Sequence, residues 1–378
     1  MRDTAATPEP FGSTAWPYPR LAVLGGGAWG TALAVIAAGA GRDVTLWCRR
    51  PAAADAMAAA RVNAEYLPDA AFPETLTVTA DLARAVGSAD AVLLVTPSKS
   101  VRELCRALRP HLGPDVPLVL CAKGIEVASG LLLTDVAAEE LPGHAIAVLS
   151  GPTFAAEAAA GHPTAVTIAS DFPPDRPAEE SVAARLAVSI GSEAFRPYVT
   201  DDIVGVEVGG AMKNVIAIAC GMMTGAGFAA NTRAALITRG LDEMKTLSDA
   251  LGGRRETVTG LSGAGDLTLT CSSTTSRNMS LGVQLGKGLA REVCFDGRAV
   301  VVEGEVNAVS VTDIARRHGL TLPICEAVRE ILHDGGEIGE TFARLWAAPL
   351  EAEARGLDLT LDHPADEEAV RRFAEQIS

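Results

Sequence analysis

The sequence predicts a doubly wound α/β domain followed by a mainly α-helical domain. Short β-branched apolar runs alternate with helical segments from residue 20 to about residue 200, and strand-like runs become scarce after Asp201. Alternating strands and helices build a parallel sheet with helices on its faces. We therefore expect an α/β domain at 20–200 and a helical domain at 201–345, with an N-terminal tail (1–19) and a C-terminal extension (346–378).

Six strands are expected in the α/β domain. They are Leu21–Leu24, Val44–Trp47, Thr77–Thr79, Ala91–Val95, Leu118–Leu120 and Ile146–Leu149. Runs without a polar residue are typical of strands buried on both faces. A helix is expected over 28–40, Pro51 can open the next at its first turn, and Asp81 can cap a third. Further along, the Ala/Leu/Met spacing of 234–251 predicts a long helix.

Composition limits the possible partners. The formal net charge of −15 argues against binding to nucleic acid or an anionic membrane, so an anionic ligand would need a local basic pocket. The seven cysteines form no CxxC pair or Cys/His cluster, which predicts no metal site and reduced thiols in a cytoplasmic protein. No secretory signal is apparent in the first 20 residues. The most apolar stretch, 215–230, is shorter than the ~20 residues of a membrane span, and we expect it to be a buried helix.

A G-x-G-x-x-G motif, Gly25-Gly-Gly-Ala-Trp-Gly30, joins the first expected strand to the first helix. In this context Gly25 would allow the tight turn, Gly27 would let the backbone approach a pyrophosphate, and Gly30 would let the helix pack closely. The helix N-terminus would offer free N–H groups to the phosphates. The motif predicts a Rossmann-type dinucleotide site; the alternative is a glycine-rich turn that binds no nucleotide.

The choice of dinucleotide depends on the end of the second strand. Arg49 and Arg50 stand roughly 20 residues beyond Gly30, where an NAD-selective site often has an acidic residue. Two arginines could contact a 2′-phosphate, or they could be ordinary surface residues. The pattern favours NADPH, with NADH as the alternative.

Two segments follow later strands and would face the same crevice. Lys123 comes directly after the strand that ends near Leu120, and the turn 150–154 follows the strand at 146–149. Ligands of open α/β sheets gather at the carboxyl ends of the strands. Lys123 could therefore face a carbonyl or phosphate, and Thr153 could supply a hydroxyl; the alternative for Lys123 is a surface cation.

Lys213 is the candidate acid/base of the helical domain. It follows Gly209 and Gly210 and precedes a long apolar run, so it is bordered by small and apolar residues. Burial would lower the pKa of its ammonium group toward the working pH, which suits proton transfer. The spacing alone also allows Lys213 to extend to the surface over apolar neighbours.

A last group of polar residues lies in 263–278. Asp266 stands in a glycine-rich turn, and Ser276, Arg277 and Asn278 together offer a fork of donors suited to a phosphate. Asp266 could instead be a simple turn residue, and the others a helix N-terminus with a surface arginine.

Taken together, these segments resemble the bacterial NAD(P)-dependent glycerol-3-phosphate dehydrogenases. The resemblance runs from about Leu21 to about Leu332, in order and at similar spacing. It is carried by GGGAWGTALA (25–34), NAEYLPD (63–69), AKGIE (122–126), SGPTFAAE (150–157), GGAMKNVIAIACGM (209–222), NTRAALITRG (231–240), GAGDLTLTC (263–271), TSRN (275–278) and VVEG (301–304). The two tails and the stretch 271–275 depart from the pattern.

The resemblance implies reduction of dihydroxyacetone phosphate to sn-glycerol 3-phosphate by a homodimer, for glycerophospholipid synthesis. It implies that Lys213 is the acid/base, with Lys123 and Asp266 as further catalytic residues. The implied substrate contacts are Lys123, Gly151, Thr153, Lys213, Asn214, Asp266, Thr270, Ser276, Arg277 and Asn278. The implied contacts to NADPH or NADH are Ala28, Trp29, Arg49, Lys123, Ala155, Arg277, Val301 and Glu303. They add to the coenzyme contacts that the motif and the second strand already predict, which are Gly25, Gly27, Gly30 and Arg50.

Two other functions fit parts of the sequence. A related 3-hydroxy acid dehydrogenase would share the two-domain plan and a lysine on a helix, but it would need a carboxylate clamp, whereas Arg277 and Asn278 suit a phosphate. A nonenzymatic dinucleotide sensor would need neither Lys213 nor Asp266. A panel of small ketone substrates separates the three.

Overall fold

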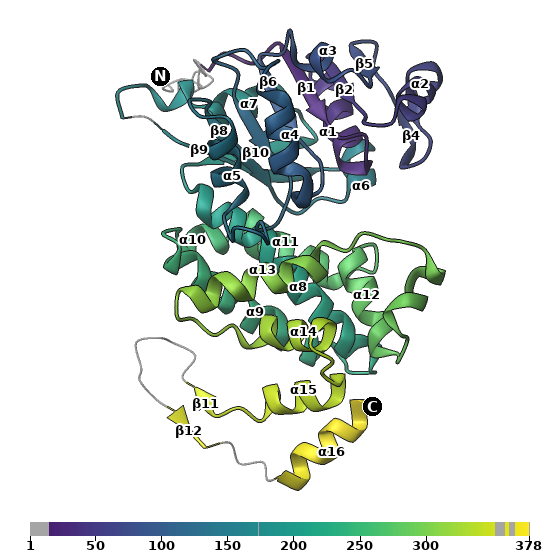
Figure 1. Cartoon of the computed structure of the whole chain (residues 1–378), viewed down its shortest axis with the longest axis vertical. Coiled ribbons are helices and arrows are strands. Elements are labelled where there is room, and N and C mark those ends of the chain that lie inside the picture. The colour runs from purple at the N-terminus through teal and green to yellow at the C-terminus, as the bar shows by residue number, and fades with distance from the viewer. Residues whose placement is uncertain (1–14, 173, 352–359, 363–366, 378) are drawn as a thin grey trace, which may run out of the picture.

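The computed structural model describes residues 15–172, 174–351, 360–362 and 367–377, and it divides into two stacked parts (Figure 1). The upper part holds a large sheet with helices on both sides, and the lower part is built from helices. The predicted fold class, an α/β domain followed by a mainly helical one, is confirmed. The last sheet strand ends at Thr200 and the first helix of the lower part begins at Ile203.

The large sheet has eight strands in the order β10-β9-β8-β7-β6-β1-β2-β5. Neighbours from β8 through β5 pair in parallel, whereas β9 runs antiparallel to β8. The bounds are β1 Arg20–Leu24, β2 Asp43–Trp47, β5 Leu76–Thr79, β6 Ala91–Leu94, β7 Leu118–Leu120, β8 Ile146–Ser150, β9 Thr164–Ser170 and β10 Phe195–Thr200.

Six of these strands were predicted, but β9 and β10 were missed. β10 lies at the edge of the sheet, contains Pro197 and buries few of its side chains, so it lacks an uninterrupted apolar run. β9 was missed although its alternating β-branched residues are typical of a strand. A separate short pair, β3 Val62–Asn63 and β4 Leu67–Ala71, was also not predicted.

Helices cover both faces of the sheet, and β1 shows why. Leu21 and Val23 pack with α1 (Ala28–Gly39) and α7 (Val182–Ile190), whereas Ala22 and Leu24 pack with α4 (Val101–Leu108) and α5 (Leu133–Glu140). Successive side chains of a strand point to opposite faces, so both faces must be apolar. The remaining helices here are α2 Pro51–Ala60, α3 Leu82–Val86 and α6 Ala155–Ala159.

Two helix starts agree with the sequence. Pro51 is the first residue of α2, and the Asp81 carboxylate accepts a hydrogen bond from the Arg84 N–H at 3.1 Å at the start of α3.

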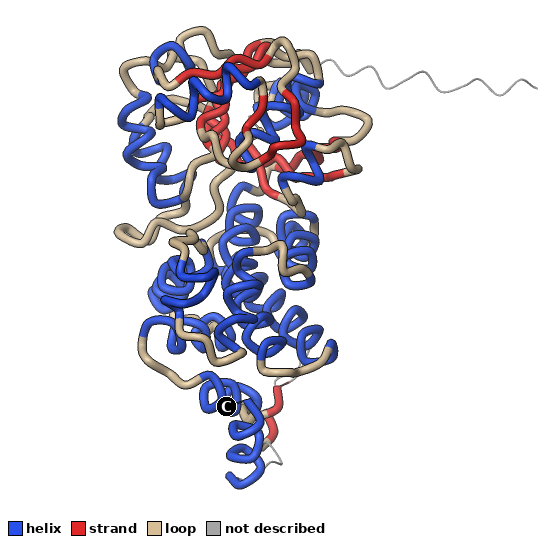
Figure 2. The backbone as a smooth tube through the Cα atoms, turned by 90° about the vertical axis from the view of Figure 1, so that its right-hand side faces the viewer, coloured by secondary structure: helices blue, strands red, loops and turns tan. Residues whose placement is uncertain are grey.

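The helical part is built around α8 (Ile203–Gly225), whose residues from 205 to 223 are buried. Figure 2 shows that the lower part of the chain is mainly helical. Around it lie α9 Ala230–Ala250, α10 Arg255–Val258, α11 Asp266–Ser272, α12 Arg277–Gly286, α13 Glu303–Arg317 and α14 Pro323–His333. Within the described residues α8 alone is long and apolar enough to cross a membrane, yet 89% of its most apolar window is buried inside the protein. The expected buried helix over 215–230 is therefore correct up to Gly225; the chain then turns before α9 begins.

The two ends of the chain are described only in part. Residues 1–14 of the expected N-terminal tail lie outside the described residues, and the Tyr18 N–H donates to Ser189 on α7. At the other end, α15 (Ile338–Trp346) is followed by a two-stranded pair, β11 Leu350–Glu351 and β12 Thr360–Leu361, and by α16 (Glu367–Ile377). The rest of the expected C-terminal extension lies outside the described residues.

Candidate active site

The Lys213 side chain is buried on α8, with 7% of the residue exposed. Its Nζ donates to Asp266 Oδ1 at 2.6 Å and to Thr270 Oγ1 at 2.9 Å. Of the two interpretations that the sequence left open, the structure shows the buried lysine and not the one that extends to the surface. Thr270, one turn after Asp266 on α11, also lies against this carboxylate.

Small residues bring Asp266 to Lys213. A Cβ atom added to Gly209 on α8 would lie 2.7 Å from the carbonyl oxygen of Ser262, so only glycine allows the two backbones to approach this closely. The segment Leu261–Gly265 forms a π-helical turn that leads into α11 and begins it with Asp266. Single π-helical turns occur often at functional sites. The glycine-rich turn that the sequence suggested is thus a helical segment that places Asp266 inside the protein.

Asp266 joins the two lysines. Lys123 Nζ, which comes from the α/β part, donates to Asp266 Oδ2 at 2.5 Å and lies 3.4 Å from the Gly151 carbonyl oxygen. Asp266 itself is 1% exposed. Burial alone would raise the pKa of Asp266, but the charges of Lys123 and Lys213 outweigh that effect and lower it. The carboxylate therefore stays ionised and holds both ammonium groups at one point between the two parts.

Burial also changes the pKa of Lys213. Desolvation lowers the pKa of Lys213 to about 8; the neighbouring Asp266 opposes this shift and the charge of Lys123 adds to it. A group with a pKa near neutrality can both donate and accept a proton at ordinary pH. Lys213 is therefore equipped to act as a general acid in one direction and a general base in the other.

A second chain of contacts starts at Asn214, the residue after Lys213. The Asn278 amide donates to Asn214 Oδ1 at 2.9 Å, and Asn278 Oδ1 accepts from the Gly304 N–H at 2.9 Å. Asn214 Nδ2 also lies 3.4 Å from a carboxylate oxygen of Glu303. Burial raises the pKa of Glu303, and the positive charge of Arg277 partly offsets this. These contacts hold the starts of α12 and α13 beside the lysine.

The N-terminus of α12 provides a cationic position at the rim of the site. Arg277 is its first residue and is exposed, whereas Ser276 caps the helix and accepts a hydrogen bond from the Met279 N–H at 3.3 Å. The helix N-terminus leaves backbone N–H groups free and carries a partial positive charge. An arginine on such a terminus is suited to bind a phosphate.

The turn after β8 closes the site from the α/β side. Gly151 has a φ of 158° and lies so close to β9 that an added Cβ would be 2.8 Å from the Val166 Cα. The Thr153 hydroxyl donates to the Gly151 carbonyl oxygen at 3.3 Å. Lys123 Nζ lies 3.4 Å from the same carbonyl oxygen, so the Thr153 hydroxyl and the Lys123 ammonium group both contact one backbone group.

The glycine loop has the geometry that a dinucleotide needs. Gly25 has a φ of 138°, and a Cβ at Gly30 would lie 1.9 Å from the Gly25 carbonyl oxygen, so the turn and the helix start are packed as closely as glycine allows. A Cβ at Gly27 would meet nothing within 4 Å, so this backbone faces open space at the N-terminus of α1. These residues fit a pyrophosphate group. Ala28, Trp29 and Ala155 lie beside this helix start in one small apolar cluster.

The two arginines after β2 lie at the surface. Both are exposed, and Arg50 Nη2 pairs with Glu65 Oε2 at 2.6 Å. Arg50, Glu65 and Gly26 line a cavity of about 250 Å³ next to the glycine loop. Val301, predicted as a coenzyme contact, is exposed just before α13. The structure thus separates an inner group around Lys213 from an outer group along the glycine loop.

Two buried asparagines that sequence reasoning did not single out support these groups. The Asn63 amide donates to the Gly26 carbonyl oxygen at 3.0 Å and to Thr31 Oγ1 at 2.8 Å, and so fastens the glycine loop. The Asn307 amide donates to the Ala211 carbonyl oxygen at 3.1 Å, two residues before Lys213. Asn307 stands four residues after Glu303, so the helical spacing of two polar residues could have indicated it.

The described residues contain no cluster of three or more possible metal ligands, and all seven cysteines are buried thiols. A glycine loop at the first strand of an α/β part, together with a buried lysine and carboxylate on the helices of a second part, is the arrangement of a two-domain, dinucleotide-dependent oxidoreductase. Residues 20–174 match the family described as NAD-dependent glycerol-3-phosphate dehydrogenase N-terminus, and residues 202–343 match the corresponding C-terminus. The chain belongs to the NAD-dependent glycerol-3-phosphate dehydrogenase family.

Individual relatives agree with this assignment. The chain is 47% identical over 336 residues to a glycerol-3-phosphate dehydrogenase, NAD(P)+, of Parvibaculum lavamentivorans, covering 89% of this chain and 98% of the relative. It is 45% identical, with the same coverage, to the Maricaulis maris enzyme of that name. The crystal structure of glycerol-3-phosphate dehydrogenase from Coxiella burnetii is similar with a TM-score of 0.81 at 37% identity, over 87% of this chain and 99% of that one.

Proposed function

We propose that this chain catalyses the NAD(P)-dependent interconversion of dihydroxyacetone phosphate and sn-glycerol 3-phosphate, with Lys213 as general acid and base. The observation that carries the proposal is the buried group Lys213–Asp266–Lys123, formed where the two parts of a glycerol-3-phosphate dehydrogenase family member meet. When bound, the reduced nicotinamide would supply the hydride to C2 of the ketone.

Lys213 handles the proton. In the direction of reduction its ammonium group donates a proton to the oxygen at C2, and in the reverse direction its amine accepts it. The pKa of about 8 allows both forms to be present near neutral pH. Thr270 and Asp266 fix the direction in which Nζ can point.

Lys123 and Asp266 set the electrostatics around that proton. Lys123 adds a positive charge near the place where an oxyanion would form, and this charge stabilises the negative charge that develops there. Asp266 holds the two ammonium groups together, which would otherwise repel each other. A substrate hydroxyl near Asp266 would find a fixed carboxylate acceptor.

We assign the substrate phosphate to the N-terminus of α12. Arg277 supplies a charged fork there, Ser276 retains a hydroxyl proton to donate, and Asn278 lies next in sequence. Gly151, Thr153 and Asn214 would border the substrate from the other side. A grip on the phosphate would fix C2 in front of Lys213.

The coenzyme would lie along the glycine loop, with its pyrophosphate at the N-terminus of α1. Gly25, Gly27 and Gly30 make room for it, and Ala28, Trp29, Ala155, Val301 and Glu303 are its proposed neighbours. Arg49 and Arg50 favour NADPH because two arginines could pair with a 2′-phosphate. The ion pair between Arg50 and Glu65 weakens this preference, because Glu65 already occupies part of the guanidinium.

We further propose a cytoplasmic homodimer that supplies glycerol phosphate for glycerophospholipid synthesis. The resemblance to the family supports the dimer and the metabolic role. The seven buried free thiols fit a reducing compartment. Light scattering on the purified chain would measure the number of subunits.

The decisive experiment is an oxidation assay with the purified chain. NADPH and NADH are each followed by the loss of reduced-nicotinamide absorbance with dihydroxyacetone phosphate, with dihydroxyacetone and with 3-oxo acids. We expect turnover with dihydroxyacetone phosphate and much less with its unphosphorylated analogue. Turnover of an oxo acid in its place would assign the chain to the hydroxy acid dehydrogenases, and no turnover with any ketone would favour a sensor.

A further inference from the structure

The segment that carries Lys123 has little regular structure of its own. Between the end of β7 at Leu120 and the start of α5 at Leu133, the chain makes one isolated bridge, Ile125 with Leu132. The Glu126 N–H also donates to the Leu131 carbonyl oxygen at 3.0 Å, which closes a turn within the loop. Lys123 nevertheless has to place its Nζ 2.5 Å from Asp266. These backbone bonds join the loop only to itself, so its position against the helices depends on side-chain contacts, among them the core packing of Ile125 and Leu132.

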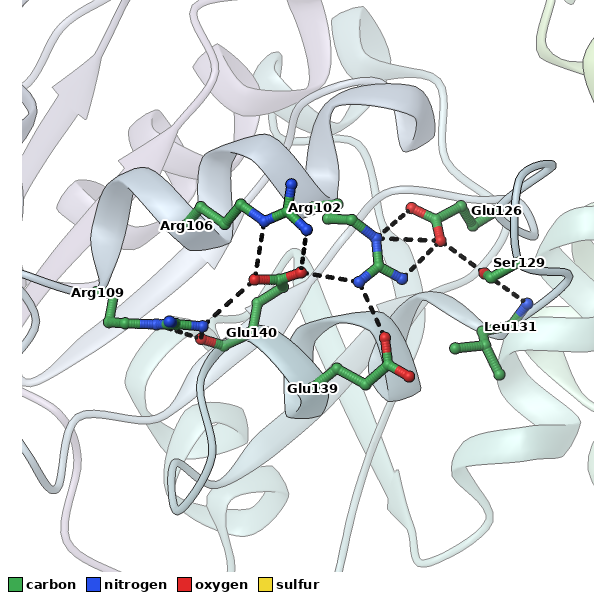
Figure 3. A network of polar contacts seen from close by, with 8 residues as sticks. All are labelled: Arg102, Arg106, Arg109, Glu126, Ser129, Leu131, Glu139 and Glu140. Carbon is green, nitrogen blue, oxygen red and sulfur yellow. Dashed lines mark hydrogen bonds and ion pairs between the residues drawn. The ribbon is translucent and has the colours of Figure 1, made fainter.

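Glu126, three residues after Lys123, is the anchor of this loop. The Arg102 guanidinium on α4 binds both Glu126 oxygens, with Nε at 2.9 and 3.2 Å and Nη2 at 2.7 Å (Figure 3). Ser129 Oγ donates to the same carboxylate at 2.6 Å, and the Ser129 hydroxyl accepts the Leu131 N–H. The Arg102 and Glu126 side chains are only 22% and 17% exposed, so solvent competes weakly for the pair.

Arg102 also contacts two carboxylates at the end of α5. Its Nη1 donates to Glu139 at 2.9 Å and to Glu140 at 2.8 Å on α5. Arg106 and Arg109 bind Glu140 from the opposite side and have no described contact with Glu126, as Figure 3 shows. The network therefore contains one arginine that contacts the Lys123 loop and two that do not.

The helical part holds the far end of the same loop. Arg317 on α13 donates from Nη1 to the Ser129 carbonyl oxygen at 2.7 Å. Gly124, next to Lys123, lies close to Asn307, since an added Cβ would be 2.8 Å from Asn307 Oδ1. The loop is thus held between α4 and α13, with Lys123 directed at Asp266 between them.

We propose that Arg102 is a positioning residue for the reaction: through Glu126 it holds the 121–132 loop so that Lys123 meets Asp266. The inference rests on the proposed function of the Lys123–Asp266–Lys213 group. Arg102 touches neither the lysines nor Asp266, and it acts only through the loop. Its loss should therefore reproduce part of the loss of Lys123.

The test compares Arg102→Gln with Arg106→Gln, which removes a neighbouring arginine of the same network. We expect Arg102→Gln to lower kcat/KM for dihydroxyacetone phosphate about 10-fold, less than the ~10²-fold that a 1 Å misplacement can cost. Arg106→Gln should change it less than about twofold, because the Arg106 side chain is 60% exposed and does not contact the Lys123 loop. Glu126→Gln, which keeps the size of the side chain, should behave like Arg102→Gln, and Arg102→Lys should restore part of the activity.

Two readouts separate positioning from a general loss of stability. In a Lys123→Ala background, Arg102→Gln should have little further effect, because the group that it positions is already gone. In the single variant, reductive methylation read by mass spectrometry should label Lys123 faster than in the unmodified chain. This labelling needs no substrate, so it tests the inference even if the proposed reaction is wrong.

Three results would overturn the inference. The first is equal effects of Arg102→Gln and Arg106→Gln, and the second is full additivity with Lys123→Ala. The third is unchanged labelling of Lys123 in both Arg102→Gln and Glu126→Gln. Absence of turnover in the unmodified chain would instead contradict the proposed function.

Discussion

Two ion pairs of the same length lie in opposite surroundings in this protein. Lys213 and Asp266 are joined at 2.6 Å with side chains 9% and 1% exposed, and Arg50 and Glu65 are joined at 2.6 Å with side chains 61% and 53% exposed. The first pair lies between the two parts of the chain, and the second lies at the surface beside the glycine loop. The two pairs therefore differ in how much solvent reaches their charged groups.

Burial makes the inner pair, Lys213–Asp266, chemically useful, and the outer pair, Arg50–Glu65, lacks this burial. Removing Lys213 from water lowers its pKa, and Asp266 limits that shift, so the outcome is a proton donor with a pKa of about 8. Water screens the outer pair, and such pairs add little to stability. A weak pair can be exchanged for another anion, which suits a place where a coenzyme phosphate could bind.

The largest effect on activity is expected when the Lys213 amine is removed. Lys213→Ala should lower kcat by about 10²–10⁴, the usual contribution of a general acid. Binding of NADPH, measured by fluorescence titration, should persist because the glycine loop is unchanged. Lys287→Ala, at the exposed end of α12, is the matched control and should retain normal turnover. Normal turnover in Lys213→Ala would remove this residue from the mechanism.

The next effect concerns the pH dependence that the inner pair sets. In the oxidation direction Lys213 must be neutral, so kcat/KM should rise with pH through about 8. Asp266→Asn removes the charge that raises the pKa of Lys213, so the rise should move to lower pH by about 1–3 units. The reduction direction needs the ammonium form and should lose activity over the same interval. If kcat/KM of Asp266→Asn rises over the same pH interval as that of the unmodified chain, a group other than Lys213 sets the pH dependence.

The smallest effect is expected at the outer pair. Glu65→Gln frees the Arg50 guanidinium and removes a negative charge from the cavity, so 2′,5′-ADP should bind about two- to fivefold more tightly, the range of an exposed ion pair. ADP, which lacks the 2′-phosphate, should bind unchanged, and in Arg50→Gln the gain should shrink. Calorimetric titration of both nucleotides measures this. Equal changes for the two nucleotides would show that the pair does not read the 2′-phosphate.

The fold could be predicted largely from local sequence patterns. Where the prediction was wrong, the reason is also local. The central strands β1, β6, β7 and β8 are mainly apolar runs because helices cover both faces, and these four were identified together with β2 and β5. β10 escaped because an edge strand with Pro197 has no such run. β9 was missed although its alternating β-branched residues are typical of a strand, and nothing in its sequence indicates that it runs antiparallel to β8. The end of α8 was placed too late because the apolar composition continues beyond Gly225 into the following turn.

The candidate site also has features that local sequence predicts and features that only tertiary contacts decide. The glycine motif indicates its geometry directly, because each glycine reports a local backbone requirement. Lys213, Asp266 and Lys123 could each be read in two ways, since they are separated by 53 and 143 residues and only their contacts distinguish a buried group from a surface one. Asn63, Asn307 and Arg102 were missed because their supporting contacts are mainly with distant segments. Of the three, only Asn307 had a local signal, its helical spacing from Glu303.

The sequence by itself determined the order of strands and helices, the glycine loop and the family, because these depend on neighbouring residues and on motifs in register. Only the tertiary structure decided that Lys213 is buried, that one carboxylate joins it to Lys123, and that Arg50 is paired with Glu65. The reason is that pKa values and ion pairs depend on burial and on distances through space. Those quantities exist only once the two parts of the chain have packed together.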